Sequence, residues 1–302
     1  MARIPLPTPD SLDALQRQVY DKVVSGPRGK LRGPFRAGAD WDCHAHVFGP
    51  YNQYPLAAGR SYTPPEATQD DYLRVLAQLE LQHAVLVQPS AYADDYTLVL
   101  DSLRRQPHWR GVLVSPQAPV SRMREWYARG VRGLRFSHRS GGNFAGSALL
   151  TDLQSMAPRM ADAGLHAEVW TDCSLLREIA PLLQDLPVPV VLDHMAGFDH
   201  RTGLDAPGFV ALCNLLQSDR VWVKLVAYRN LHGVSDPSAG APFQQRLCEV
   251  NPNQLVWGSD WPHLNLKPMP ATSALLDQFR LWCCDATLVR RILVDNPQRL
   301  YR

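Results

Sequence analysis

Two histidines one residue apart, His44 and His46, are the side chains best suited to chemistry near the start of this chain. They lie in an apolar stretch that predicts a β-strand, in which alternate side chains point to the same face. His44 and His46 should therefore lie side by side, with Asp42 in phase behind them and Cys43 facing away. Paired imidazoles at a strand end can form half of a metal site, or can move protons and polarise a carbonyl group.

Polar side chains that could complete such a site follow the ends of other apolar runs. Imidazoles and carboxylates are common general acids and bases, and arginines bind anionic groups. The candidates are Ser90, Tyr92, Arg135, Glu168, Trp170, Asp193, His194, Arg229, Asp260 and His263. No single one is specific, but His44 and His46 combined with His194 and Asp260 indicate one functional site.

Arg135 and Arg229 are predicted to hold anionic groups of a substrate, because a guanidinium donates two parallel hydrogen bonds to a carboxylate. The alternative for each arginine is a surface ion pair. The remaining candidates for substrate contacts are Ser90, Tyr92, His263 and, as an apolar wall or as a core residue, Trp170.

Strands that alternate with helices must position these side chains. The predicted strands are 41–46, 84–88, 111–114, 133–136, 167–170, 188–193, 221–225 and 255–258. The predicted helices are 71–81, 96–104, 121–129, 150–163, 175–184, 208–217, 243–249, 273–283 and 286–294. Eight such units favour an α/β fold, a (β/α)8 TIM barrel over residues 39–302, in which function gathers where the strands end. A doubly wound open sheet is the alternative, but no glycine-rich phosphate motif follows any strand.

Composition limits the function classes. The chain has 302 residues, a net charge of +2 and 45% hydrophobic residues, so it does not indicate nucleic-acid or membrane binding. Residues 1–38 include a basic, Gly/Pro-rich stretch and are interpreted as an N-terminal extension or arm. The first ten residues lack an apolar signal core, and the six cysteines show no C-x-x-C pair, so we expect a cytoplasmic protein.

The chain resembles the amidohydrolase superfamily from Asp42 to Arg302. The motifs that carry the resemblance are His44-Ala-His, Val190-Val-Leu-Asp-His-Met and Trp257-Gly-Ser-Asp-Trp-Pro-His, with Val131-Arg-Gly-Leu-Arg-Phe between the first two. They are similar to the branch that contains 2-pyrone-4,6-dicarboxylate lactonase and related lactone hydrolases. The resemblance implies a barrel enzyme that hydrolyses a C–O ester bond inside a ring.

The resemblance also implies roles for four residues. Asp260 would be the general base that activates water, and His194 would help to hold that water. His44 and His46 would polarise the substrate carbonyl group or bind a metal ion. The predicted ligand is a small lactone or carboxylate.

The metal question depends on the other ligands. Metal-dependent members of the superfamily add a Lys, His or Glu to the two histidines. Here the fourth strand offers Arg135, which cannot be a neutral ligand, so we expect a metal-free enzyme. A zinc or manganese ion, if bound, would use His44, His46 and Asp260, with Glu168 as a further candidate.

One departure from the branch concerns the substrate. The resembled Asp-His-Met run continues into Gly-Arg-Pro, whereas this chain continues into Ala196-Gly197-Phe198. One anion-binding arginine is therefore missing, and Arg139 or Arg201 is predicted to replace it, or else the substrate carries one carboxylate fewer. Two other functions stay open at this point: a metal-dependent decarboxylase of the same superfamily, and a non-catalytic barrel that binds a small acid.

Overall fold

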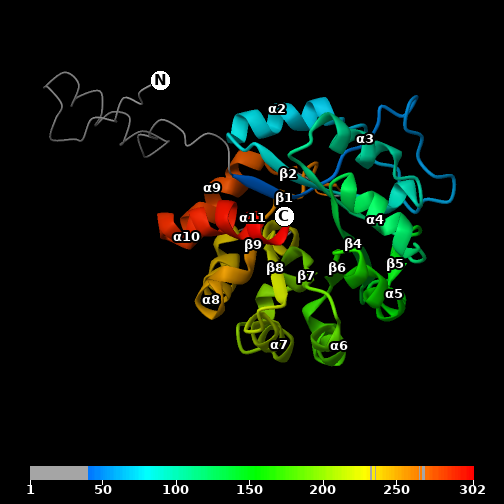
Figure 1. Cartoon of the computed structure of the whole chain (residues 1–302). Coiled ribbons are helices and arrows are strands. Elements are labelled where there is room, and N and C mark those ends of the chain that lie inside the picture. Colours follow the sequence, from blue (N-terminus) through cyan, green and yellow to red (C-terminus); the bar gives the residue numbers. More distant parts are fainter. Residues whose placement is uncertain (1–39, 232, 235, 265, 267–268) are drawn as a thin grey trace, which may run out of the picture. The chain divides into compact units, whose positions relative to one another are not determined.

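The structure is a computed structural model that describes residues 40–302 except 232, 235, 265, 267 and 268. The predicted extension, residues 1–38, lies outside the described residues. The described part forms one unit, in which parallel strands at the centre are surrounded by helices (Figure 1).

The strands form one parallel sheet in the order β1-β2-β3-β4-β6-β7-β8-β9, and the short β5 pairs with β4. All eight predicted strands are present, with bounds that differ by a few residues at most. The bounds are β1 Trp41–Ala45, β2 His83–Val87, β3 Arg110–Leu113, β4 Val131–His138, β5 Ala148–Leu149, β6 His166–Thr171, β7 Val190–Leu192, β8 Val221–Leu225 and β9 Leu255–Trp257.

The sheet closes on itself between β9 and β1. Ala45 forms a parallel bridge with Trp261, whose carbonyl accepts a hydrogen bond from the backbone N–H of His46 at 2.8 Å. The backbone N–H of Asp260 donates to the carbonyl of His44 at 2.7 Å. The predicted TIM barrel is thereby confirmed, and the open sheet is excluded.

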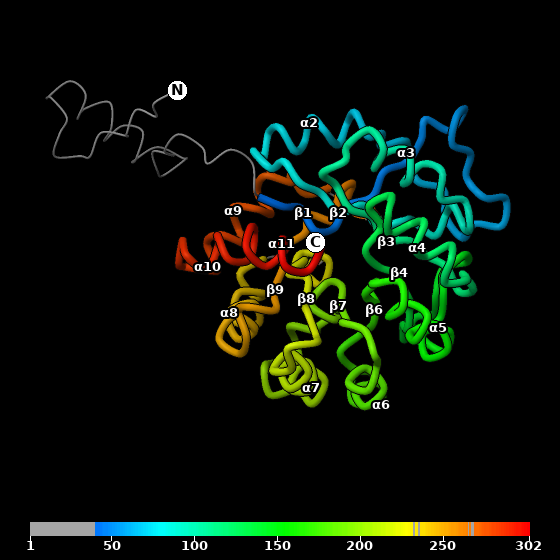
Figure 2. Tube along the Cα trace, in the orientation of Figure 1, coloured from blue at the N-terminus to red at the C-terminus, as the bar shows by residue number. Residues whose placement is uncertain are grey.

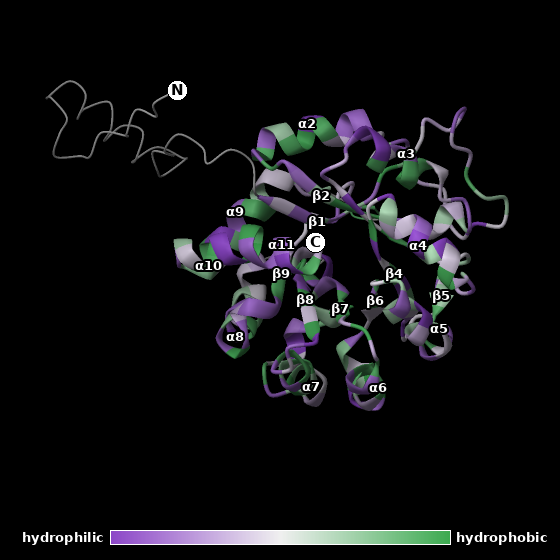
Figure 3. Ribbon diagram, in the orientation of Figure 1, coloured by the Kyte–Doolittle hydropathy of each residue, from purple (hydrophilic) through white to green (hydrophobic). Residues whose placement is uncertain are grey.

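The helices form a ring outside the strands, in chain order around the barrel (Figure 2). Most of them have a buried face; in α2, for example, Tyr72, Leu76 and Leu79 are buried, whereas the short α10 has no buried residue. Their ribbons accordingly carry both hydrophilic and hydrophobic segments (Figure 3). The bounds are α2 Gln69–Leu79, α3 Thr97–Arg105, α4 Val120–Ala128, α5 Leu150–Asp162, α6 Cys173–Asp185, α7 Pro207–Leu216, α8 Ala241–Val250, α9 Thr272–Cys283, α10 Ala286–Arg290 and α11 Asn296–Leu300.

The final predicted helix, 286–294, is divided in the structure. Residues Arg291–Asp295 form a π-helical turn between α10 and α11. Helix α11 crosses one end of the barrel, where the C-terminus lies (Figure 1). Tyr301 is buried there against Trp41 and Val256, so the end of the chain fills the interior of the barrel.

The predicted alternation in β1 is wrong for Asp42 and Cys43. The register against β2 shifts between Asp42 and Ala45. Because of this shift, Cys43 lies in the interior cluster with Val87 and Val191. Asp42 instead accepts hydrogen bonds from Tyr72 of α2 at 2.8 Å and from the Ser259 backbone. Cys43 therefore faces the interior of the barrel instead of pointing away from it.

None of the helices in the described part of the chain has the length and hydropathy needed to cross a bilayer.

Candidate active site

Asp260 lies at the seam of the barrel, three residues after β9 ends. Its backbone has a φ of 54°, a left-handed conformation that is uncommon for residues other than glycine. The hydrogen bond from its N–H to His44 ties this turn to β1. The seam thus brings a carboxylate from the end of the chain to the two histidines near its start.

Three imidazoles surround the Asp260 carboxylate. Its Oδ1 lies 3.3 Å from Nε2 of His46 and 3.6 Å from Nε2 of His44. Its Oδ2 lies 3.7 Å from Nε2 of His194. The structure therefore brings together all four residues predicted for catalysis.

His46 and His44 are oriented by their second ring nitrogens. Nδ1 of His46 lies 2.7 Å from the carbonyl of Val87, which can only accept, so this nitrogen carries the proton. Nε2 of His46 is therefore left to face Asp260. Burial, aided by the charge of Lys224, lowers the pKa of His44 well below its usual value, so its ring is neutral.

His194 follows β7 in a tight turn, Asp193–Gly197. Four successive residues there have positive φ values, from 50° at His194 to 58° at Gly197. The side chain of Asn230 donates to the His194 carbonyl at 2.7 Å and holds the turn. Burial lowers the pKa of His194, and both its ring nitrogens are buried without a hydrogen-bond partner among the described residues. A neutral imidazole is thus free to interact with a ligand.

Arg229 forms an ion pair with Asp260, through both Nε and Nη2. Tyr228 donates to the same Oδ2 atom at 3.0 Å. Burial alone would raise the pKa of Asp260, but the charge of Arg229 and the contact with His194 outweigh it and hold this pKa well below its usual value. The carboxylate is therefore ionised in the absence of a ligand.

A cluster of buried charges lies next to His44. Lys224 Nζ is 2.5 Å from Oε2 of Glu168, 3.4 Å from Oδ1 of Asp193 and 3.2 Å from Nδ1 of His44. Arg135 donates from Nε to Oδ2 of Asp193 at 2.7 Å. Lys224, Glu168, Asp193 and His44 are fully buried, so the charges of this cluster are balanced by contacts with one another and with Arg135.

A cavity of about 230 Å³ opens above Asp260. Seven of the predicted site residues line it: His46, Ser90, Arg135, Trp170, His194, Arg229 and Asp260. Among its other lining residues are Tyr62, Arg139 and Phe144. Phe144 lies against both Tyr62 and Trp170, with ring centroids 5.1 Å and 5.6 Å apart, so one wall is aromatic.

Tyr92 and His263, predicted as substrate contacts, are not among the residues that line the cavity. The hydroxyl of Tyr92 accepts a hydrogen bond from the Gly49 N–H at 2.8 Å. His263 contacts the hydroxyl of Tyr228 at 3.0 Å and that of Thr272 at 2.9 Å. Tyr92 therefore holds a loop, and His263 lies behind Tyr228.

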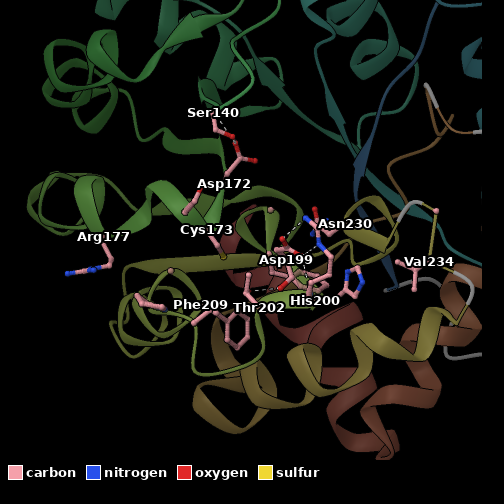
Figure 4. Close-up of a pocket in the computed structure, with 18 residues that line it drawn as sticks. Ser140, Asp172, Cys173, Arg177, Asp199, His200, Thr202, Phe209, Asn230 and Val234 are labelled. Carbon is pink, nitrogen blue, oxygen red and sulfur yellow. Dashed lines mark hydrogen bonds and ion pairs between the residues drawn. The ribbon is translucent and has the colours of Figure 1, made fainter.

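A second, larger hollow of about 1060 Å³ lies beside the cavity, between α6, α7 and the turn after β7. In Figure 4, Asp172 points toward Ser140, and Arg177 extends away from Asp172. Asn230 lines both the hollow and the cavity. Arg201, predicted as one replacement for the missing arginine, lines this hollow and pairs with Asp199.

The similarity to known proteins covers the same part of the chain as the barrel. A sequence profile of the family described as Amidohydrolase matches residues 41–302. The chain belongs to the amidohydrolase family.

Two relatives of this amidohydrolase are named for lactone substrates. A 4-sulfomuconolactone hydrolase from Rhizobium radiobacter is 32% identical over 274 residues, which cover 86% of this chain and 89% of the relative. A 2-pyrone-4,6-dicarboxylate hydrolase from Comamonas testosteroni is 31% identical over 278 residues, with 86% and 89% covered. An apo crystal structure of an Agrobacterium tumefaciens protein has the same fold, with a TM-score of 0.79 and 24% identity over 89% of this chain and 97% of that one.

The donor atoms around Asp260 fit a divalent metal ion. His44, His194 and Asp260 offer ligand atoms within 4.8 Å of one another, and Nε2 of His46 faces the same carboxylate oxygen. Nε2 of His44 and both ring nitrogens of His194 have no hydrogen-bond partner in the described residues. Three imidazoles and one carboxylate are a ligand set that zinc accepts.

A second set of potential metal ligands consists of His44, Glu168 and Asp193, and its surroundings differ from those of Asp260. The ammonium group of Lys224 contacts all three residues. A cation thus already lies among these atoms, so this set does not fit a metal ion.

Sequence reasoning assigned no role to Lys224, Tyr228, Asn230 or the aromatic neighbours of Trp170. Lys224 did carry a signal, because a lysine stands inside the apolar run Val221–Leu225. A charged residue in a buried strand requires a partner. The signals for Tyr62 and Phe144 were weaker, because both lie in loops between strands.

Proposed function

We propose that this amidohydrolase opens the ring of a small anionic lactone by hydrolysis. The observation that carries the proposal is the Asp260 carboxylate, which is ionised, lies next to His44, His46 and His194, and lines the cavity together with His46 and His194. The two lactone hydrolases that are 31–32% identical to the chain support the same reaction.

In the proposed mechanism, Asp260 takes a proton from a water molecule that His194 helps to place. The water oxygen attacks the ring carbonyl carbon, whose oxygen is polarised by His44, while the unprotonated Nε2 of His46 accepts a hydrogen bond from the attacking water. The tetrahedral intermediate then collapses, the ring C–O bond breaks, and the leaving oxygen takes up the proton. The products are a free carboxylate and a hydroxyl group on one open chain.

The arginines explain the choice of an anionic substrate. Arg135 and Arg229 line the cavity, and each is already paired with a carboxylate of the protein. A ligand carboxylate that shares Arg229 would weaken its hold on Asp260, which would make Asp260 a stronger base. Binding of the substrate and activation of the base are thereby linked.

We propose that these residues act without a metal ion. Arg229 already holds Oδ2 of Asp260, and the nearby charges of Arg135 and Lys224 oppose a further cation. If zinc or manganese binds, His44, His46, His194 and Asp260 would hold it, and the ion would supply Lewis-acid polarisation of the carbonyl group. Decarboxylation is not favoured, because the named relatives are hydrolases.

A cytoplasmic location belongs to the same proposal. All six cysteines are free thiols, which agrees with a reducing compartment. The proposed ligand is a small molecule rather than a macromolecule, because the site is a cavity of about 230 Å³ inside the barrel.

A panel of lactones tests the function, with release of acid followed at neutral pH on an indicator. The panel contains 4-sulfomuconolactone, muconolactone, 2-pyrone-4,6-dicarboxylate and 2-pyrone-6-carboxylate. We expect turnover of at least one anionic lactone by the wild type. Binding without turnover of any member would instead indicate a small-acid-binding barrel.

A further inference from the structure

Arg139 is the most accessible of three arginines that line the cavity. It follows β4 and lines the cavity with Arg135 and Arg229. Its side chain is 28% exposed, against 10% for Arg135 and 23% for Arg229. Arg135 is bound into the buried cluster by Asp193, and Arg229 is bound to Asp260. Arg139 is therefore free of the catalytic groups and lies nearer to solvent.

Asp172 and Trp170 hold Arg139 in place. Nε of Arg139 lies 3.0 Å from Oδ1 and 3.1 Å from Oδ2 of Asp172, and its guanidinium lies 4.4 Å from the centroid of the Trp170 ring. Asp172 also accepts two hydrogen bonds from Ser140, from its N–H and from its hydroxyl group, both at 2.8 Å. The guanidinium is thus anchored through Nε. This anchoring leaves the two Nη groups to donate hydrogen bonds to a ligand.

Trp170 brings two guanidinium groups to one place. Arg135 lies 4.9 Å from the centroid of the same ring over which Arg139 lies. A ligand beside Trp170 therefore meets two positive groups, of which only Arg139 is outside the buried cluster.

The place beside Asp172 cannot be taken by a side chain from the turn after β7. A Cβ atom on Gly197 would lie 2.9 Å from Oδ1 of Asp172 and 2.9 Å from the carbonyl of Thr171. Gly197 also has a φ of +58°, which disfavours other residues. Position 197 therefore cannot supply a guanidinium at this edge of the cavity, and Arg139 from the loop after β4 supplies one.

We propose that Arg139 is a specificity residue that binds a second anionic group, carboxylate or sulfonate, on the lactone. The inference rests on the proposed function and names its substrate class: a ring with one anionic group near Arg229 and another near Arg139. Both oxyanions accept the parallel hydrogen bonds of a guanidinium.

Ring acids that cannot be hydrolysed separate binding from catalysis. Calorimetry compares benzoate, isophthalate and 3-sulfobenzoate with the wild type and with Arg139→Gln. We expect the wild type to bind both dianions more tightly than benzoate, and Arg139→Gln to lose about ten- to one-hundredfold in affinity for them. Benzoate affinity should stay the same. The ratio of isophthalate to 3-sulfobenzoate affinity shows which oxyanion is preferred.

Arg201→Gln is the matched control. Arg201 also pairs with an aspartate, Asp199, but it lines the larger hollow and not the cavity. It should leave all three affinities unchanged. Asp172→Asn is a second variant, because it keeps Arg139 and removes the charge that anchors it, and it should weaken dianion binding to a smaller extent. Thermal melts verify that each variant is folded.

The results separate the two proposals. Equal losses for benzoate and the dianions, no loss in Arg139→Gln, or a wild type without preference for dianions would overturn the role of Arg139. A wild type that prefers dianions through Arg139 but hydrolyses none of the lactones would overturn the proposed function alone. For a hydrolysed lactone pair, kcat/KM should fall in Arg139→Gln only for the dianionic member.

Discussion

Asp260 and His44 are joined by the backbone hydrogen bond that closes the barrel, 2.7 Å long, while the Asp260 carboxylate lies 3.6 Å from Nε2 of the same histidine. One contact thus belongs to the seam of the sheet and the other to the active site. Since the first residues of the barrel must pair with its last strand, the site is complete only when the whole barrel is folded. The proposed base is therefore held by the fold itself and not by a mobile loop.

We predict that Asp260→Asn lowers kcat by about 10²- to 10⁴-fold, because the amide cannot accept a proton from water. The shape of the side chain and the seam hydrogen bond are kept, so the protein should still fold, but the buried ion pair with Arg229 is lost and the melting temperature should fall. Initial rates on a hydrolysed lactone and circular dichroism measure the two effects. Asp277→Asn, on the exposed face of α9, is the control for loss of a carboxylate. Full activity in Asp260→Asn would refute the mechanism.

Lys224→Met is predicted to destabilise the fold. It removes the ammonium group that lies between Glu168 and Asp193, and both are fully buried. Breaking a buried ion pair costs about 3–5 kcal/mol. Denaturant unfolding above pH 8, where Glu168 is ionised, should show this loss, and the double variant Lys224→Met/Glu168→Gln should recover part of it. Additive losses in the double variant would show that Lys224 and Glu168 do not interact.

The strands and the rim of the barrel could be predicted because apolar runs mark buried strands and the residues that follow them share one end of the sheet. The direction in which a side chain points beyond a strand end could not be predicted. Tyr92 and His263 follow the correct strands, yet the hydroxyl of Tyr92 binds Gly49 and the ring of His263 lies behind Tyr228. Spacing along the chain does not determine these loop conformations.

The contacts of the inward side chains of the barrel were still harder to predict from the sequence. Cys43 lies inside because of a register shift in β1, which alternation alone cannot indicate. Lys224 on β8 meets Glu168 on β6 although β7 lies between these strands in the sheet. Such contacts depend on the tertiary arrangement of the strands and not on any local pattern.

Glu168 provides a pH-dependent prediction. Burial, together with the charge of Asp193, raises the pKa of Glu168 from its usual 4.5 to about 8. Between these pH values the folded state keeps a proton that the unfolded state has lost. The contribution of the protonated Glu168 to the free energy of unfolding is therefore complete below pH 4.5, and it disappears as the pH rises to about 8.

Glu168→Gln imitates the protonated carboxyl group at every pH. We expect the wild type to lose stability relative to Glu168→Gln as the pH rises through this window, by up to about 1.4 kcal/mol per pH unit. Urea unfolding of both proteins at a series of pH values measures the difference. A constant difference would mean that Glu168 is ionised in the folded state.

A chelator tests the metal-free mechanism. Asp260 is already neutralised by Arg229, so we predict that dialysis against EDTA leaves kcat unchanged and that the purified protein holds less than stoichiometric zinc or manganese. Elemental analysis and rates on the same sample provide both readings. One metal ion per chain, with activity lost on chelation and restored by zinc, would assign His44, His46, His194 and Asp260 as its ligands.

Gly197→Ala tests the link between the turn after β7 and Arg139. The new Cβ would approach both Asp172 and the carbonyl of Thr171 to 2.9 Å, in a backbone conformation that alanine disfavours. We predict a loss of about 1–2 kcal/mol in the free energy of unfolding. Because Asp172 must move, Arg139 should also lose its anchor, and affinity for isophthalate should fall while that for benzoate does not.

Gly203→Ala is the control for the backbone effect alone. Gly203 has a φ of +79°, but a Cβ there would have no neighbour within 4 Å. Gly203→Ala should therefore cost stability without any change in isophthalate affinity. Equal effects of the two substitutions on binding would show that the crowding around Asp172 does not position Arg139, because both variants share the conformational strain and only Gly197→Ala adds the contact.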